Sequence, residues 1–471
     1  MALWEKTATA LSEDLLKGEI TPIDVLETCE RRVGETEPHI NALPTLCFER
    51  AYQQAKSLMK DKTNFSKLPL AGIPIAIKDN TEVAGVRTTF GSPIFKDFVP
   101  NHSHPLVTKL ENAGAIIVGK SNCPEFAAGG STFNDVFGRT ANPWNTKLTS
   151  GGSTGGGAAA LAAGSLWLAH GTDHAGSLRR PATYCGVVGM RPSPGLVTRG
   201  ETFGLYSPVS THGPMARNVE DIALLMDAMV GFCPFDPMTF PCSDTLFREA
   251  VRTPRLPLRV AFTSNFGGLV PMERETEEAA RKALHLLEGL GVEVVEDAPN
   301  TDMMDDVFMI LRGQEYARDF YELIKKQPEQ LKEDIIWNTK QGLAASIDDV
   351  AKAERRRASF YQETVRFFQN YDLLITPGAS TPAFPIEQKM PQSIDGLPLT
   401  NYLGASLITG IPTHMGMPCL SLPTGLDKSG RPLGLQLIGG PRADADLLRF
   451  AKAMEMVFGF TGIPRQPNTP S

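Results

Sequence analysis

Two glycine-rich segments of the sequence each carry a serine that could act in catalysis. Residues 151–157 read Gly-Gly-Ser-Thr-Gly-Gly-Gly and lead directly into an alanine-rich stretch that is predicted to be helical. Ordering so many glycines costs conformational entropy, so the segment is either a flexible linker or a tight, functional loop. The direct passage into a helix favours the loop, because a helix N-terminus offers unpaired N–H groups to developing negative charge. Ser153 is therefore a candidate for chemistry.

The second serine, Ser177, lies 24 residues further on in the segment Gly171–Arg179. The small residues before Ser177 could bring several backbone N–H groups together and form an oxyanion hole. Asp173 and Arg179 flank this serine and could hold the turn by a charge-assisted hydrogen bond. A purely structural turn with a buried ion pair explains the same residues, so this segment alone leaves both interpretations open.

A lysine completes the set of residues that could do chemistry. Lys78 follows the short apolar run 73–77, which is typical of a buried strand. A lysine in this position commonly extends its amine into solvent. Beside two serines that need a base, however, a buried lysine would have a lowered pKa and could accept a proton. A shift from about 10.4 to near neutrality amounts to roughly 4 kcal/mol, which burial can supply.

The elements that would position these residues alternate between helices and strands. Helices are expected at 8–34 (divided at Thr21-Pro22), 46–60, 106–113, 158–169, 274–289, through most of 305–370, and at 443–457. Strands are expected at 73–77, 115–118, 258–263, 292–296, 373–376, 419–422 and 433–438. This alternation predicts an α/β fold with a central mixed β-sheet flanked by α-helices. Without an internal repeat or a long linker, we expect one large domain over residues 1–471, with a mobile tail at 462–471.

The composition argues against several classes of protein. The 46 Lys and Arg residues against 53 Asp and Glu give a net charge of −7 without a basic run, which argues against nucleic-acid binding. No apolar run of about 18 residues predicts a membrane span, and residues 1–10 do not resemble a secretory signal. The seven cysteines are scattered, which indicates neither a zinc site nor a disulfide framework and favours a reducing cytoplasm. His102 and His104 lack an obvious third ligand, so no metal is expected.

Together, these motifs resemble the amidase signature family. The resemblance rests on Gly-Gly-Ser-Thr-Gly-Gly at 151–156, on Gly-Thr-Asp-x-x-Gly-Ser-x-Arg-x-Pro-Ala at 171–182, and on Lys78 upstream. Ser153 follows Lys78 by 75 residues and precedes Ser177 by 24, which suits the Ser–Ser–Lys triad of that family. Further matches are Phe137–Trp144, Gly213–Asp221 and Gly434–Gly439. The resemblance is most specific over a signature core at 70–225 and weaker over 230–370, a largely helical region where such enzymes differ in their substrate pockets.

The resemblance implies a role for each candidate residue. Ser177 would be the acylated nucleophile, Ser153 would follow a cis peptide bond and relay the proton, and a neutral Lys78 would be the general base. Neither a metal nor a cofactor is implied, and a homodimer is suggested. The backbone N–H groups expected to form the oxyanion hole are those of His174, Ala175, Gly176 and Ser177, and main-chain atoms at Ala127 are expected to contact the substrate.

The oxyanion segment departs from the family pattern at two positions. His174 and Ala175 stand where the family usually has a small or apolar residue and a glycine. Backbone donors survive such changes, but Ala175 then requires a loop conformation that does not depend on glycine. His174 could narrow the pocket or contact the leaving group. Because no member of the triad is replaced, an active enzyme is expected.

The expected activity is hydrolysis of a carboxamide or anilide bond in a small-molecule substrate, with ester or carbamate cleavage as possible side activities. One alternative is the glutamine-hydrolysing subunit of a tRNA amidotransferase complex, which would use the same triad and pass ammonia to a partner. A second alternative is a non-catalytic binding protein. Gly151–Gly155 also matches the G-x-S-x-G nucleophile elbow of α/β-hydrolases, but that motif needs a preceding strand, and none is predicted here.

Overall fold

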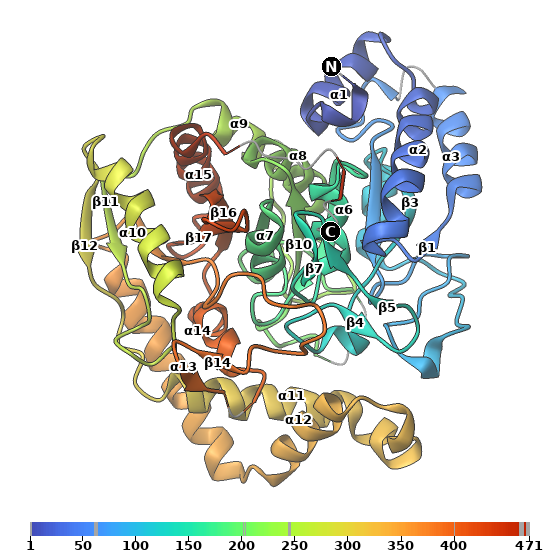
Figure 1. Ribbon diagram of the computed structural model, residues 1–471. Helices are drawn as coiled ribbons and strands as arrows, with labels where there is room; N and C mark the ends of the chain where they lie inside the picture. Colours follow the sequence, from blue (N-terminus) through green and yellow to red (C-terminus); the bar gives the residue numbers. More distant parts are fainter. Residues whose placement is uncertain are drawn as a thin grey trace.

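The computed structural model describes residues 2–60, 65–200, 202, 204–243, 246–399, 401–460 and 466–467. These residues form one α/β domain around an 11-stranded mixed sheet, flanked by helices as the sequence predicts (Figure 1). The strand order is β1-β3-β2-β8-β10-β9-β16-β17-β13-β11-β12. Apart from residues 466 and 467, the predicted mobile tail at 462–471 lies outside the described residues.

The strands of the large sheet differ widely in length. They are β1 (Thr45–Leu46), β2 (Pro74–Lys78), β3 (Ile116–Ser121), β8 (Leu168–Asp173), β9 (Val188–Arg191), β10 (Thr211–Ala216), β11 (Arg259–Phe262), β12 (Glu293–Glu296), β13 (Leu373–Pro377), β16 (Cys419–Leu426) and β17 (Pro432–Gly439). Three two-stranded sheets lie outside it: β4 (Phe133–Asn134) with β5 (Gly138–Arg139), β6 (Ala141–Asn142) with β7 (Asn145–Thr149), and β14 (Ser393–Ile394) with β15 (Leu397–Pro398).

The helices include two long ones, α11 and α13, and α11 packs against both α12 and α13 at one end of the molecule (Figure 1). The α-helices are α1 (Ala8–Lys17), α2 (Pro22–Ile40), α3 (Phe48–Lys60), α5 (Pro105–Asn112), α6 (Gly155–Ala162), α7 (Arg179–Cys185), α8 (Val219–Met229), α9 (Leu246–Arg252), α10 (Arg274–Glu288), α11 (Met304–Lys326), α12 (Glu333–Ala344), α13 (Ile347–Phe367), α14 (Leu407–Met415) and α15 (Asp444–Phe458). None of the described helices is long and apolar enough to cross a lipid bilayer.

The predicted division of the N-terminal helical region at Thr21-Pro22 is confirmed. Thr21 caps α2 by accepting a hydrogen bond from the Asp24 N–H group, and Pro22 occupies the first helical position. Proline is favoured there because the N–H group it lacks would have no partner within the helix. The second helix runs on to Ile40, beyond the predicted end at residue 34, because its apolar face continues into the core.

The predicted helix over 158–169 is wrong in its second half. Helix α6 ends at Ala162, Gly164 adopts a left-handed φ of 74°, and strand β8 begins at Leu168. The apolar residues after the glycine are buried in the sheet rather than on a helix face. A short apolar run does not distinguish a buried helix from a buried strand, and here sheet pairing with β2 and β10 decided the outcome.

The pairing of β2 with β8 sets up the functional region. The two strands run parallel, with Ile75 opposite Leu168 and Ala76 opposite Ala169. All five residues of β2 are buried, as expected for a strand covered on both faces. Because parallel strands end at the same edge of a sheet, Lys78 at the end of β2 lies beside Thr172 and Asp173 at the end of β8.

Candidate active site

Lys78 and Ser153 are joined by a buried hydrogen bond. Both residues are inaccessible to solvent, and Lys78 Nζ donates to Ser153 Oγ at 2.7 Å. A second bond runs from Lys78 Nζ to Thr172 Oγ1 at 2.9 Å. Burial lowers the pKa of Lys78 to about 8, because a charged ammonium is costly away from water. The structure therefore places an amine of lowered pKa in contact with a serine hydroxyl.

Ser153 lies in the loop between β7 and α6, after a cis peptide bond with Gly152. The glycines of this loop allow close approach of other backbone segments. A Cβ on Gly152 would lie 3.0 Å from the carbonyl carbon of Ser131, and a Cβ on Gly156 would overlap the backbone of Asn122. The glycine-rich segment is therefore a tightly packed loop, as the sequence predicts, and not a linker.

Ser177 lies in the loop between β8 and α7, and this loop is tied to the Ser153 loop through the backbone. The Thr154 N–H group donates to the Ser177 carbonyl at 3.1 Å. Ser153, Thr172 and Ser177 all line one cavity of about 320 Å³. The structure thus brings the two predicted serines to a single cavity, which is also lined by Thr172, the second hydrogen-bond partner of Lys78.

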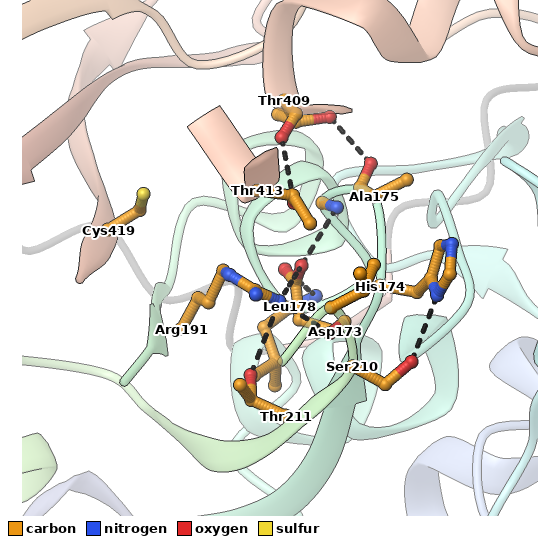
Figure 2. Close-up of polar contacts among 12 residues, drawn as sticks. Asp173, His174, Ala175, Leu178, Arg191, Ser210, Thr211, Thr409, Thr413 and Cys419 are labelled. Atoms are coloured by element: carbon orange, nitrogen blue, oxygen red, sulfur yellow. Dashed lines mark hydrogen bonds and ion pairs between the residues drawn. The ribbon is translucent and has the colours of Figure 1, made fainter. Parts of the chain in front are cut away.

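A buried ion pair stabilises the loop that carries Ser177. The Asp173 carboxylate receives two hydrogen bonds from Arg179, from Nη2 at 2.7 Å and from Nε at 3.0 Å. Arg191 Nη1 donates to the Asp173 carbonyl at 2.7 Å (Figure 2). Burial alone would raise the pKa of Asp173, but the two guanidinium groups outweigh it and hold that pKa below its ordinary value. The carboxylate is therefore ionised and has a structural role.

Asp173 also engages the backbone of the segment predicted to form the oxyanion hole. Its carboxylate accepts hydrogen bonds from the N–H groups of Gly176 at 3.0 Å and Leu178 at 3.1 Å. The Gly176 N–H group, one of the expected oxyanion donors, is therefore already engaged. Among the described residues, the N–H groups of His174, Ala175 and Ser177 have no hydrogen-bond acceptor. These three of the four expected donors remain available beside the Ser177 hydroxyl.

The backbone conformation of this segment explains how Ala175 is accommodated. Gly176 has a φ of 100°, whereas Ala175 does not need a positive φ. The Ala175 carbonyl accepts a hydrogen bond from Thr409 Oγ1 at 2.7 Å (Figure 2). A Cβ on Gly176 would overlap that same threonine side chain. The positive φ that favours glycine therefore occurs at Gly176, and Ala175 does not have to adopt it.

His174 lines the cavity as a neutral imidazole. Its Nδ1 lies 2.9 Å from Ser210 Oγ and 3.3 Å from Glu315 Oε2, and its Nε2 is buried without a hydrogen-bond partner among the described residues (Figure 2). Burial lowers the pKa of His174 well below its ordinary value. The imidazole is therefore part of the cavity wall, and the two roles expected from the sequence, narrowing the pocket or contacting the leaving group, stay predictions.

Ala127 also lines the cavity. Its backbone is left-handed, with a φ of 59°, and the preceding Phe126 has a φ of 47°. The Ala127 N–H group donates to the Pro124 carbonyl at 2.8 Å and is therefore turned to the protein. A main-chain contact between Ala127 and a substrate would accordingly come from its carbonyl oxygen.

Several cavity residues were not anticipated from the sequence. Helix α7 contributes Arg180, helix α11 contributes Arg312 and Tyr316, and the segment before α14 contributes Tyr402. The consecutive arginines at 179 and 180 were the available signal, since two cations at the start of a short apolar helix need partners or a ligand. The residues of α11 carry no recognisable motif.

Metal binding finds no support in the described part of the chain. No group of three or more His, Cys, Asp or Glu side chains there is arranged to hold an ion. His102 is exposed and bonded to Asn101, whereas His104 caps helix α5 and stacks on His212. The H-x-H pair therefore diverges into two different environments.

Comparison with known proteins identifies the family. A glutamyl-tRNA(Gln) amidotransferase subunit from Thermosynechococcus vestitus is 35% identical over 474 residues, covering 94% of this chain and 96% of that protein. A bacterial aryl acylamidase of the amidase signature enzymes superimposes with a TM-score of 0.89 at 25% identity, covering 98% of both chains. A glutamyl-tRNA(Gln) amidotransferase subunit from Thermotoga maritima superimposes with a TM-score of 0.76 at 27% identity, covering 100% of both. The Amidase family matches residues 24–448, and this chain belongs to it.

Proposed function

We propose that this protein hydrolyses the C–N bond of a carboxamide or anilide through an acyl-enzyme on Ser177. The Ser177 hydroxyl attacks the carbonyl carbon and gives its proton to Ser153 Oγ, which passes its own proton to neutral Lys78 Nζ. Collapse of the tetrahedral intermediate breaks the C–N bond, and the amine leaves with the proton returned through Ser153. Water then hydrolyses the acyl-enzyme by the same proton route. Esters and carbamates offer the same carbonyl and are possible side substrates.

The observation that carries this proposal is the 2.7 Å hydrogen bond between Lys78 Nζ and Ser153 Oγ in a site that also presents Ser177. A base must contact the proton it removes and must have a pKa near the working pH. The buried Lys78, with a pKa of about 8, meets both requirements. The unengaged N–H groups of His174, Ala175 and Ser177 are the donors we assign to the tetrahedral oxyanion.

The test is labelling by a fluorophosphonate followed by intact-mass measurement. Wild type should gain one adduct, Ser177→Ala should gain none, and peptide mapping should place the adduct on Ser177. An adduct of the same size that persists in Ser177→Ala would move the nucleophile elsewhere, with Ser153 the first candidate. Complete absence of an adduct and of amide hydrolysis would instead favour a non-catalytic binding protein.

A second candidate is glutamine hydrolysis as one subunit of a tRNA amidotransferase. The names of the relatives favour it, because those at 35% identity over nearly the whole chain are amidotransferase subunits. The triad chemistry is the same, so only substrate and partner distinguish the candidates. Ammonia release from glutamine that rises on addition of copurified partner subunits would establish this role. Efficient turnover of simple amides by the isolated chain, without glutaminase activity, would exclude it.

A further inference from the structure

Arg180 is a buried cation without a partner in the wall of the catalytic cavity. The residue is only 5% exposed, and its Nη2 atom is buried without a hydrogen-bond partner. Among the described residues, no carboxylate lies within 4.0 Å of the Arg180 guanidinium, and none of the guanidinium nitrogens makes a hydrogen bond. The neighbouring Arg179, in contrast, is fully paired with Asp173. A buried guanidinium in this condition is costly unless a ligand compensates its charge.

A second buried arginine adds positive charge to the same cavity. Arg312 is also 5% exposed, and its hydrogen bonds go to Asn338 Oδ1 at 3.0 Å and to the hydroxyls of Tyr316 and Tyr402 at 2.7 and 2.8 Å. All three partners are neutral, and no carboxylate of the described residues pairs with Arg312. These contacts fix the orientation of the guanidinium without neutralising it.

The carboxylates that line the cavity are mostly engaged elsewhere. Asp173 pairs with Arg179, Asp319 pairs with Arg318, and Glu315 contacts Ser207 and His174. The remaining one, Glu82, forms no ion pair with Arg180 or Arg312 within the described chain. Arg180 and Arg312 therefore form no ion pair with any carboxylate of the described residues, while Glu82 and Glu315 contribute negative charge to the same cavity.

The position of Arg180 relates it to the reacting bond. Arg180 lies three residues after Ser177, and its backbone N–H group donates to the Gly176 carbonyl at 2.8 Å. A Cβ on Gly130 would lie 2.7 Å from Arg180 Nη1, so the guanidinium packs against the Gly129–Ser131 backbone. The same backbone segment packs against Gly152, beside Ser153. The Gly129–Ser131 segment therefore lies between the Arg180 guanidinium and the peptide that joins Gly152 to Ser153.

We propose that Arg180 binds a carboxylate group of the amide substrate. The preferred substrates are then amides whose acyl chain carries a carboxylate at the end away from the amide. This inference rests on the proposed function and names the substrate class for that site. Arg312 contributes longer-range attraction for the same anion. The class includes monoamides of dicarboxylic acids and the side-chain amide of glutamine, so it is compatible with both candidate functions.

The experiment compares ammonia release from paired substrates by the full-length protein. Succinamate, glutaramate and adipamate are each matched with the amide in which a methyl group replaces the carboxylate: butyramide, valeramide and hexanamide. In at least one pair, wild type should prefer the carboxylate in kcat/KM. Arg180→Gln should reduce that preference roughly 10- to 150-fold, as expected for a lost charge-assisted hydrogen bond at a buried site. Arg180→Lys should retain part of it.

The matched control is Arg50→Gln, which removes an equal charge from an arginine of helix α3 that is paired with Glu111 and does not line the cavity. Its carboxylate preference should stay within about threefold of wild type. Calorimetry of succinate, glutarate and adipate binding gives a readout that needs no turnover. Arg180→Gln should weaken the affinity for these dicarboxylates, and Arg180→Lys should retain measurable binding. Thermal unfolding of each variant checks that the fold is intact.

The outcomes separate this inference from the proposed function. Wild type that hydrolyses the methyl-terminated amides as well as the carboxylates in all three pairs would overturn the carboxylate site and leave the amidase proposal in place. Diacid binding that is equal in wild type and Arg180→Gln would also overturn it. Loss of both the Ser177 adduct and all amide hydrolysis would refute the proposed function, and diacid binding would then decide the Arg180 site alone.

Discussion

Asp173 and Arg179 lie at opposite ends of the loop that carries Ser177 and close it with a buried ion pair of two hydrogen bonds. The same carboxylate holds the N–H groups of Gly176 and Leu178, so one side chain fixes both the ends and the middle of the loop. Ser177, the proposed nucleophile, therefore lies on a loop whose conformation is fixed before a substrate arrives.

Asp173→Asn should lower both activity and stability. The substitution removes the charge that compensates two buried guanidinium groups, and breaking a buried pair costs about 3–5 kcal/mol. Chemical denaturation should report that loss, and fluorophosphonate labelling of Ser177 should slow. Asp319→Asn is the control, because its pair with Arg318 is partly exposed and worth at most about 1 kcal/mol. Equal stabilities for the two variants would contradict the structural role of Asp173.

Lys78→Met should separate catalysis from stability. Lys78 has no carboxylate within 4.0 Å in the described chain, so replacing it by an apolar side chain should leave the free energy of unfolding unchanged or raise it. Activity should fall by about 10²- to 10⁴-fold, the usual contribution of a general base. Turnover and denaturation are measured on the same preparation.

The control for Lys78→Met is Lys120→Met, at a second fully buried lysine. Lys120 lies 3.5 Å from Asp79 and donates to Thr88 Oγ1 at 2.8 Å. Removing it leaves the Asp79 carboxylate without its cation, so this variant should be strongly destabilised. Destabilisation by Lys78→Met with retained turnover would argue against a base at this position.

Activity should rise with pH until the pH reaches about 8, which is the pKa of Lys78. In the folded protein the pKa of Lys78 is lowered to about 8 by burial, so below that pH the amine is increasingly protonated and cannot accept the serine proton. The value of kcat/KM should therefore fall about tenfold per pH unit below pH 7. The rate of Ser177 labelling should follow the same curve. A flat profile between pH 5 and 9, with the fold intact, would refute a neutral lysine base.

Gly176→Ala should lower both the stability and the Ser177 labelling rate far more than Gly268→Ala, a replacement at a glycine of similar φ. Gly176 has a φ of 100° and faces Thr409, whereas Gly268 has a φ of 92° with open space around its Cα. Both substitutions bear the cost of a left-handed alanine, about 1 kcal/mol. Only Gly176→Ala adds the clash with Thr409, which should displace the loop and abolish Ser177 labelling. The two variants are compared by thermal unfolding and labelling rate, and similar behaviour would show that the loop adapts.

Local sequence patterns predicted much of the fold because the relevant signals lie within a few residues. The apolar run before Lys78 identified β2, and Thr21-Pro22 identified the start of α2. Strands β9 and β10 were not predicted, since a segment such as Thr-His-Gly-Pro-Met-Ala has neither alternation nor β-branched enrichment. Their strand conformation comes from pairing with β8 and β16, which lie far away in the sequence.

The sequence by itself determined which residues can do the chemistry: two serines on glycine-rich loops, a lysine after a buried strand, and an aspartate and arginine that flank the second serine. Residue type and spacing carry that information. Only the tertiary structure decided that Lys78 contacts Ser153, that the Gly176 N–H group is engaged by Asp173, and that Arg180 is buried without a partner among the described residues. The physical reason is that hydrogen bonding, burial and pKa depend on neighbours that distant segments supply.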